Sequence, residues 1–149
     1  MNNKAAGTRF EKEFAEILAA HWFWVHLFQD NKNGQPCDVI AARNGHTYLF
    51  DCKDCQGNFF PLKRMVENQY NAMHLFELTG NGKGRFAIRF ASQDIYLIDY
   101  WQLKALADSG VKQIDRMDCK IYGCKFEDWL DAKDRADGWS EEDADHNWK

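Results

Sequence analysis

The sequence predicts an α/β fold in which a mixed β-sheet is flanked by helices. Three patterns predict it. Apolar side chains recur at helical spacing over residues 9–21. Short runs rich in β-branched and aromatic residues follow, and an Asn44-Gly45 pair separates two of them, which is the sequence signal of a tight hairpin. Further helix-like and strand-like runs continue to about residue 130, so we expect helices packed on a sheet.

The expected elements follow one another in the order helix, three strands, helix, two strands and helix. Pro61 is expected to open the second helix, because proline is favoured at the first helical position. The pattern over 111–130 is ambiguous, and we expect a short strand near 119–122 and a helix near 126–130. The other expected ranges are a helix at 9–21, strands at 22–29, 37–42 and 47–53, strands at 85–91 and 94–98, and a helix at 100–107.

Charge is unevenly distributed along the 149 residues. The net charge of −4 resides in residues 131–149, which hold seven acids and three bases, so residues 1–130 are neutral. We therefore expect a single domain at 1–130, followed by an acidic C-terminal tail at 131–149 that is either a solvated end or a strip that mimics DNA. The overall charge neither supports nor excludes a nucleic-acid partner.

The longest apolar stretch, 15–28, contains His21 and His26 and is too short to span a bilayer. Nothing resembles a signal peptide, so we expect a soluble intracellular protein with no membrane partner. Five cysteines in such a chain are expected to be reduced thiols. The alternative is a zinc site, and it would use the four cysteines with the closest spacing: Cys52, Cys55, Cys119 and Cys124.

The predicted hairpin brings two carboxylates together. If Asn44 and Gly45 are the central turn residues, Asp38 lies directly opposite Asp51, with the two side chains on one face of the sheet. Strand alternation places Lys53 on that face as well. Opposed like charges destabilise a sheet unless something neutralises them, and Mg²⁺ is typically held by one or two carboxylates. A metal site is therefore one interpretation.

The alternative interpretation of this pair is a solvated strand end, where charges cost little. The apolar run 48–50 before Asp51 is typical of an interior strand and favours the metal site. A register shift of one residue would move one acid to the other face. Two further polar residues border apolar helix faces. Glu11 lies beside the stripe of the first helix, and Gln69 lies among apolar residues of the second, where a buried amide needs a partner.

Together these residues resemble the PD-(D/E)xK nuclease superfamily and, within it, the RecU family of Holliday-junction resolvases. The matching pieces, over about residues 7–100, are Gly7-x2-Phe10-Glu11, Asp38, Asp51-Cys52-Lys53, and Phe60-Pro61-Leu62 followed by Gln69. The sequence departs from the family in two places. Asp51 stands where glutamate is more frequent, and the long insertion before the first catalytic aspartate is missing, with only a short turn between Phe28 and Cys37.

The resemblance implies a restriction-endonuclease-like fold, a Mg²⁺ cofactor with Mn²⁺ as a substitute, and hydrolysis of DNA phosphodiesters, with branched or four-way junction DNA as the substrate. Asp38, Asp51 and Glu11 would be metal ligands, Lys53 would assist the attacking water, and Gln69 would position that water or Lys53. The family also implies a bacterial or phage-encoded cytoplasmic protein. Bases near the cluster are expected to contact the DNA backbone: Lys4, Arg9, Lys63 and Arg64.

The resemblance further implies a homodimer, because resolving a junction takes two symmetric cuts and the chain has one catalytic set. Six aromatic residues around the site could form an exposed interface or could fill the core: Trp22, Phe23, Trp24, Phe28, Phe59 and Phe60. Three other functions remain open from the sequence. They are a nuclease of the same superfamily with a different structural or sequence preference, a DNA-binding module without cleavage, and a zinc-stabilised interaction protein.

Overall fold

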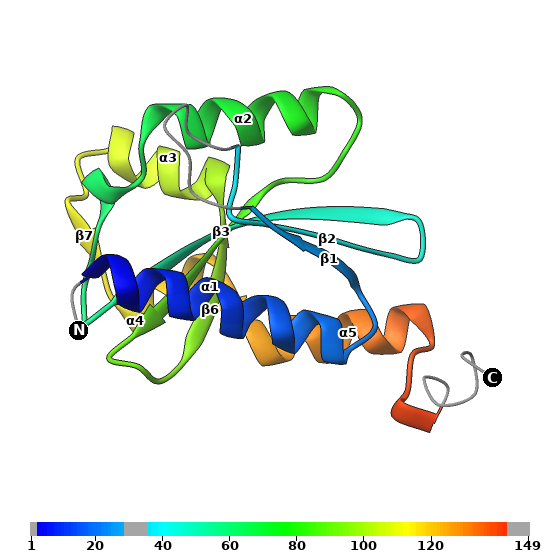
Figure 1. Cartoon of the computed structure of the whole chain (residues 1–149). Helices are drawn as coiled ribbons and strands as arrows, with labels where there is room; N and C mark the ends of the chain where they lie inside the picture. Colours follow the sequence, from blue (N-terminus) through cyan, green and yellow to red (C-terminus); the bar gives the residue numbers. More distant parts are fainter. Residues whose placement is uncertain (1–2, 29–35, 143–149) are drawn as a thin grey trace.

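The computed structural model describes residues 3–28 and 36–142, with side chains from residue 9 onward. Within this part the chain folds around a six-stranded mixed sheet with strand order β1-β2-β3-β5-β6-β8, and β4 and β7 form a separate small sheet (Figure 1). Strands β3 and β5 are parallel, and the other neighbours in the main sheet are antiparallel. The expected mixed sheet flanked by helices is therefore confirmed.

The helices and strands alternate along the chain. Their bounds are α1 (Asn3–Ala20), β1 (Trp24–Leu27), β2 (Val39–Arg43), β3 (His46–Cys55), β4 (Phe60–Pro61), the 3₁₀ turn η1 (Leu62–Arg64), α2 (Glu67–Leu78), β5 (Arg85–Phe90), β6 (Ile95–Asp99), α3 (Tyr100–Asp108), β7 (Gln113–Ile114), α4 (Arg116–Tyr122), β8 (Cys124–Lys125) and α5 (Phe126–Asp137).

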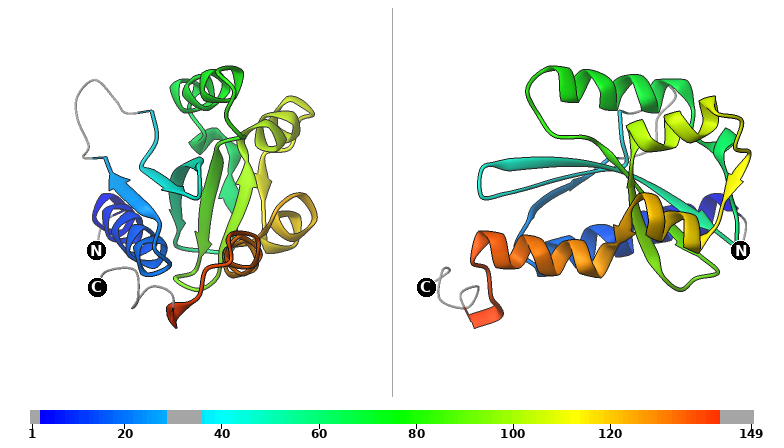
Figure 2. Two further views of the ribbon diagram at one scale, coloured as in Figure 1. Left: turned by 90° about the vertical axis from the view of Figure 1, so that its right-hand side faces the viewer. Right: turned by 180° about the vertical axis from the view of Figure 1, so that it is seen from behind.

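Helices cover the two faces of the sheet in two layers (Figures 1 and 2). Helices α1 and α5 lie against one face, where Phe14 and Trp129 join Phe50 in one apolar core. Helices α2 and α3 lie against the other face, where Met73 and Leu103 belong to a second core. Each strand of the sheet centre therefore buries both faces, which explains why β3 and β5 are apolar along most of their length.

The second helix begins later than the sequence predicts. Pro61 does not open it but belongs to β4, which pairs with β7, and the backbone N–H of Leu62 donates to the carbonyl of Lys112 at 2.9 Å. The 3₁₀ turn follows, and α2 begins at Glu67. Proline at a strand edge loses no sheet hydrogen bond when its nitrogen faces away, so the distant pairing overrides the local helix signal.

The C-terminal third also differs from expectation. The strand expected near 119–122 is wrong, because α4 covers this segment and is capped by Asp115, whose carboxylate accepts from the backbone N–H of Asp118. The expected boundary between residues 130 and 131 falls inside α5, which continues to Asp137. Residues 131–137 are therefore part of the folded domain. None of the helices in the described part of the chain is long and apolar enough to cross a membrane.

Candidate active site

The β2–β3 hairpin has the register that the sequence predicts. Arg43 pairs with His46 and Ile40 with Leu49, and both turn residues have positive φ, 54° at Asn44 and 79° at Gly45. Positive φ at both positions is the geometry of the tight turn that Asn-Gly favours.

At its other end the same hairpin positions the two aspartates. Asp38 directly precedes β2, and its backbone N–H donates to the carbonyl of Phe50 at 3.0 Å. The Asp38 carboxylate Oδ2 accepts from the backbone N–H of Cys52 at 2.7 Å. Asp38 and Asp51 are 8% and 1% exposed, so the sheet carries two acids out of water at one place. The alternative of a solvated strand end is therefore wrong.

Burial raises the pKa of Asp51 to about 7, the Lys53 ammonium opposes this rise, and the neighbouring Asp38 carboxylate adds to it. The Nζ atom of Lys53 lies 3.1 Å from Asp51 Oδ1 and 6.0 Å above the ring of Phe86. The strand alternation that the sequence predicts thus places Lys53 beside Asp51. One nearby ammonium does not balance a buried carboxylate whose neighbour is a second carboxylate.

Glu11 lies on α1, the helix that packs over Cys52 of β3. This helix is fixed on the sheet by Phe10 and Phe14, which are fully buried. Glu11 is half-buried and close enough to Cys52 to help raise the pKa of that thiol, after burial and the two aspartates. Glu11 is therefore near the segment of β3 that carries Asp51 and Lys53, and its role as a metal ligand remains a prediction.

Gln69 has a local structural partner. Its amide Oε1 accepts from the backbone N–H of Val66 at 3.2 Å and so caps the first turn of α2. This is the backbone-satisfying role that a polar side chain at such a position often has. A role for Gln69 in positioning water or Lys53 remains a prediction.

The four expected DNA-contacting bases differ in how the structure places them. Arg64 lies next to β3, where its Nη1 donates to the carbonyl of Asp54 at 3.3 Å, and its guanidinium lies over the ring of Phe60. Lys63 and Arg9 are exposed. The side chain of Lys4 lies outside the described residues.

Sequence reasoning missed an ion network behind the cluster. The guanidinium of Arg89 binds both carboxylate oxygens of Asp54, at 3.2 and 3.0 Å, and also contacts Glu13 on α1. It also lies over the ring of Phe10, 4.5 Å from its centroid. This network ties α1 to β3 and β5 and so sets the position of the helix that carries Glu11. The signal in the sequence was an arginine inside a predicted interior strand, which needs a buried partner.

The donor set fits a hard divalent cation. Asp51 Oδ1 is buried, and the Lys53 ammonium 3.1 Å away is one cation beside two neighbouring carboxylates. Carboxylate oxygens are preferred ligands of Mg²⁺, which usually keeps several waters and needs only one or two protein carboxylates. Among residues 3–28 and 36–142, no three acidic, histidine or cysteine side chains converge as a complete metal cage. The assignment of Asp38 and Asp51 as ligands of such a cation, with Glu11 further out, remains a prediction.

The alternative zinc site is not formed. The four cysteines of its two predicted halves divide between the faces of the sheet. Cys52 belongs to the core under α1 and α5, and Cys124 packs against that core, whereas Cys55 and Cys119 belong to the core under α2 and α3. The sheet separates the members of each predicted pair, so they cannot share a tetrahedral ion.

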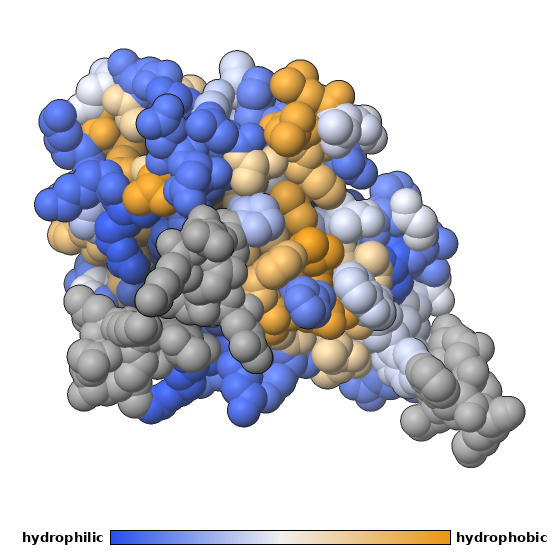
Figure 3. Space-filling view, turned by 45° about the horizontal axis from the view of Figure 1, so that its top comes forward, coloured by the Kyte–Doolittle hydropathy of each residue, from blue (hydrophilic) through white to orange (hydrophobic). Residues whose placement is uncertain are grey.

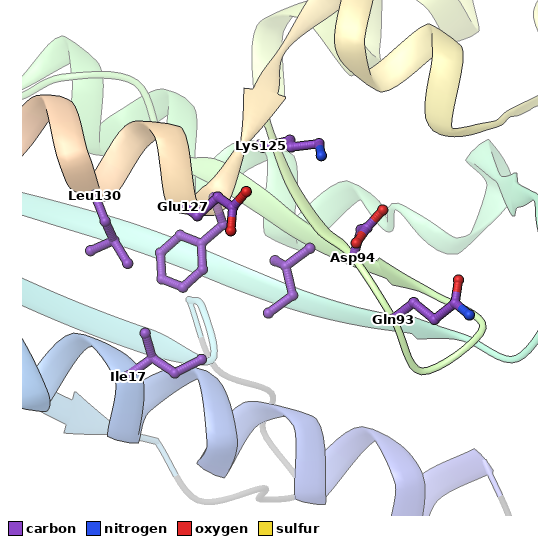
Figure 4. A pocket seen from close by; sticks show the side chains of 8 residues that line it. Ile17, Gln93, Asp94, Lys125, Glu127 and Leu130 are labelled. Atoms are coloured by element: carbon purple, nitrogen blue, oxygen red, sulfur yellow. The ribbon is translucent and has the colours of Figure 1, made fainter.

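A further hollow opens between α1 and α5 and contains none of the predicted site residues (Figure 4). Ile17 and Leu130 form its apolar wall, and Asp94, Lys125 and Glu127 lie at its rim. The hollow is lined by both acidic and basic side chains. It lies on the face of the sheet that α1 and α5 cover, whereas Lys53 lies on the other face. It does not extend the carboxylate cluster.

Known proteins resemble this chain in sequence and in fold. The family model described as RecU, Recombination protein U, matches residues 29–128. A solved structure of Hjc, a Holliday junction resolvase from the archaeal hyperthermophile Archaeoglobus fulgidus, superposes with a TM-score of 0.61 at 14% sequence identity. The match covers 84% of this chain and 95% of that one, so the two share a fold over nearly their full lengths. A comparison with curated protein sequences gave no match.

Proposed function

The chain belongs to the RecU family of Holliday-junction resolvases, and from this premise we propose that it hydrolyses phosphodiester bonds of branched DNA at the Asp38–Asp51–Lys53 cluster. The observation that carries this proposal is the excess of buried negative charge on β3. Asp51 is 1% exposed, its neighbour is another carboxylate, and its pKa is raised to about 7. Such a group gains free energy when a cation binds.

Each residue has a role that follows from its position. Asp38 and Asp51 would hold Mg²⁺ or Mn²⁺, and Glu11 would act as an outer or second-metal ligand. When bound, the ion polarises the scissile phosphate and lowers the pKa of its bound water. The Lys53 ammonium, 3.1 Å from Asp51, would orient the attacking water and stabilise charge that develops on the phosphate oxygens. Arg9, Lys63 and Arg64 would contact the DNA backbone.

We also propose a homodimer, because a junction resolvase makes two symmetric cuts and this chain carries one catalytic set. The exposed aromatic residues support this proposal. Of the six aromatics that the sequence places near the site, Phe23 and Phe60 fill the core, whereas Trp24 is 63% exposed. Trp22 and Phe59 are exposed too, and Phe28 is half-buried. On the edge strand β1, Trp24 stacks on His26. On the face drawn in Figure 3, apolar residues run through the middle between polar regions. A two-fold pair would cover such a surface.

The proposed function is tested by comparing cleavage of four-way junctions, flaps, linear duplex and single strands, each with Mg²⁺ and with EDTA. We expect Mg²⁺-dependent, symmetric cuts in the junction and little cutting of linear duplex. Cleavage of all four substrates at equal rates would contradict the preference for branched DNA and leave a nuclease of the same superfamily. DNA binding without cleavage in Mg²⁺ or Mn²⁺ would indicate a non-cleaving module.

The dimer is tested separately by light scattering at micromolar concentration. We expect a mass of about twice the 17.4 kDa monomer, and we expect Trp24→Arg to shift the mass toward the monomer. A wild-type mass of one chain that persists with junction DNA and Mg²⁺ would contradict the dimer.

A further inference from the structure

A basic pocket lies at the tip of the β2–β3 hairpin, distant from the candidate site along β3. The hairpin tip, the loop that joins α2 to β5, and α5 meet at the same end of the molecule (Figures 1 and 2). Four of the residues that line the pocket carry basic or imidazole side chains, and none of them is acidic. These four, from separate elements, are His46, Lys83, Arg85 and Lys133.

Two of these cations are held by aromatic rings and have no carboxylate partner. The Lys133 Nζ lies 5.4 Å from the ring centroid of Tyr48 and 5.7 Å from that of Trp129. The Arg85 guanidinium lies 5.7 Å from the same Trp129 ring. Within the described part of the chain, no acid lies within ion-pair distance of either side chain. Cation–π contacts position a charge without neutralising it, so both remain available to an anion.

The nearest acids are already bound to other groups. Asp137 on α5 accepts from Arg43 and Asn44, and Glu77 at the end of α2 pairs with Lys83 at the rim. Asp99 is close enough to Arg85 to interact with its charge, but its carboxylate caps α3 through the backbone of Gln102. The pocket therefore keeps net positive charge.

The backbone of the pocket leaves room for a ligand. Gly45, Gly80 and Gly82 line it, and a Cβ atom built on any of them would meet no atom within 4 Å. The N–H of Gly80 already donates to the carbonyl of Glu77 at 3.0 Å, so Gly45 and Gly82 are the positions where an anion could approach the backbone closely. Open glycine backbone together with unpaired cations is the chemistry that recognises phosphate.

The distance between the pocket and the Asp38–Asp51–Lys53 cluster indicates which phosphate of a bound DNA the pocket could contact. Residues 46–48 lie three to five positions before Asp51 on β3, about 10–17 Å along the strand at about 3.3 Å per residue. Lys133 and Arg85 lie beside Trp129 on the face of α1 and α5, whereas Lys53 lies over Phe86 on the other face, so the pocket is at least this far from the cluster. Phosphates along one strand of a duplex recur about every 3.4 Å of axis, so the separation corresponds to at least about three to five phosphates. We propose that the pocket formed by Lys133, Arg85 and the 80–83 loop binds a backbone phosphate several nucleotides from the scissile bond and so fixes one arm of the substrate. This inference rests on the proposed function for the choice of DNA as the ligand.

The test measures junction affinity in EDTA against salt concentration, so that cleavage does not enter the result. We expect Lys133→Gln to lower the slope of log K against log salt by about 0.9, the loss of one phosphate contact, and to weaken binding roughly threefold to tenfold at low salt. The matched control is Lys120→Gln, an exposed lysine on α4 that does not line the pocket. It should leave both the slope and the affinity unchanged.

A second pair of variants separates charge from packing. Gly82 is exposed and has open space at its Cβ position, so Gly82→Asp and Gly82→Ala should both fold. We expect Gly82→Asp to weaken junction binding, with a much smaller effect of Gly82→Ala. Inorganic phosphate and a nucleoside triphosphate, titrated as competitors, distinguish a DNA contact from a site for a free anion. If either competes at micromolar concentration, the pocket takes a free anion and the proposal is wrong.

Unchanged salt slopes in both Lys133→Gln and Gly82→Asp would overturn the proposal, even if the wild type cleaves junctions. Conversely, a wild type that binds DNA but does not cleave it would overturn the proposed function, and the slopes would still test the pocket.

Discussion

The two ends of the β2–β3 hairpin each carry a buried cluster of one cation and two carboxylates, and the two clusters differ in how burial and hydrogen bonds shift the pKa of their acids. At the tip, Arg43 binds Asp137 through Nε at 2.8 Å and Asp134 through Nη1 at 2.9 Å, and it donates to the carbonyl of His21. Although burial opposes it, hydrogen bonds from Arg43 and Asn44 hold the pKa of Asp137 below its usual value. At the other end, burial raises the pKa of Asp51.

This difference indicates that one cluster stabilises the fold and that the other binds a ligand. Arg43 lies over the ring of Phe23, 4.1 Å from its centroid, and its cluster fixes α5 on the hairpin with both carboxylates hydrogen-bonded, although Arg43 Nη2 is buried and has no acceptor among the described residues. In the Asp38–Asp51 pair, the Lys53 ammonium lies 3.1 Å from Asp51, yet burial keeps the pKa of Asp51 raised. Buried carboxylates that are hydrogen-bonded on all sides stabilise a fold, whereas an incompletely compensated set indicates a ligand.

The largest effect is expected from the removal of the ammonium in the incomplete cluster. Lys53→Ala should reduce cleavage of a junction about a hundredfold or more, because stabilisation of developing charge is lost. DNA binding should stay within a few-fold of wild type, because it is spread over many phosphates. Single-turnover cleavage and binding in EDTA measure the two quantities. A variant that cuts at the wild-type rate would remove Lys53 from the site.

A substitution in the cluster of Arg43, Asp134 and Asp137 should lower the stability of the fold and not the cleavage rate alone. Arg43→Ala leaves Asp134 with His21 and Asp137 with Asn44 but removes the cation from both acids, and we expect a loss of about 3 kcal/mol in the free energy of unfolding. Urea unfolding in EDTA measures it. Lys53→Ala is the matched control and should change the same quantity by less than about 1 kcal/mol, because the neutral form of Asp51 needs no partner. Equal losses in the two variants would contradict the contrast between the clusters.

The pH dependence of stability sharpens the comparison. The pKa of Asp51 is about 7 in the folded chain against an ordinary value of 3.8, so between these values the folded state binds more protons than the unfolded state. The free energy of unfolding of the metal-free protein should therefore fall as pH rises from about 4 to 7. Asp51→Asn should flatten this dependence and be more stable than wild type at pH 7.5, by about 1 to 4 kcal/mol.

Urea unfolding of both proteins at pH 5 and pH 7.5, in EDTA, tests this prediction. Asp134→Asn is the control, because its acid is paired with Arg43, and it should be less stable than wild type at pH 7.5. A wild-type pH dependence that persists in Asp51→Asn would show that another group causes it.

Features that depend on residues close together in the sequence could be predicted, and features that depend on residues far apart in the sequence could not. The register of the hairpin follows from two residues, Asn44 and Gly45, so the positions of Asp38, Asp51 and Lys53 could be predicted without the structure. The strand at Phe60–Pro61 could not, because its partner, 113–114, lies far along the chain and the local pattern favours a helix.

The same limit applies to charged side chains. The acids of 131–137 are typical of a solvated end when read locally, and only the contact of Asp134 and Asp137 with Arg43 makes them structural. Likewise, the partner of Asp54 is Arg89 on β5, and the pairing of those strands cannot be read from either segment alone.

The most direct measurement of the central claim, that the incomplete cluster is a cation site, is the shift of the melting temperature with Mn²⁺. A ligand that binds only the folded state at ten times its dissociation constant stabilises it by about 1.4 kcal/mol, a shift of a few degrees. We expect this shift in the wild type and in Asp134→Asn, and we expect it to be lost in Asp38→Asn and Asp51→Asn. An equal shift in all four proteins would show that the cation binds elsewhere and would contradict the account.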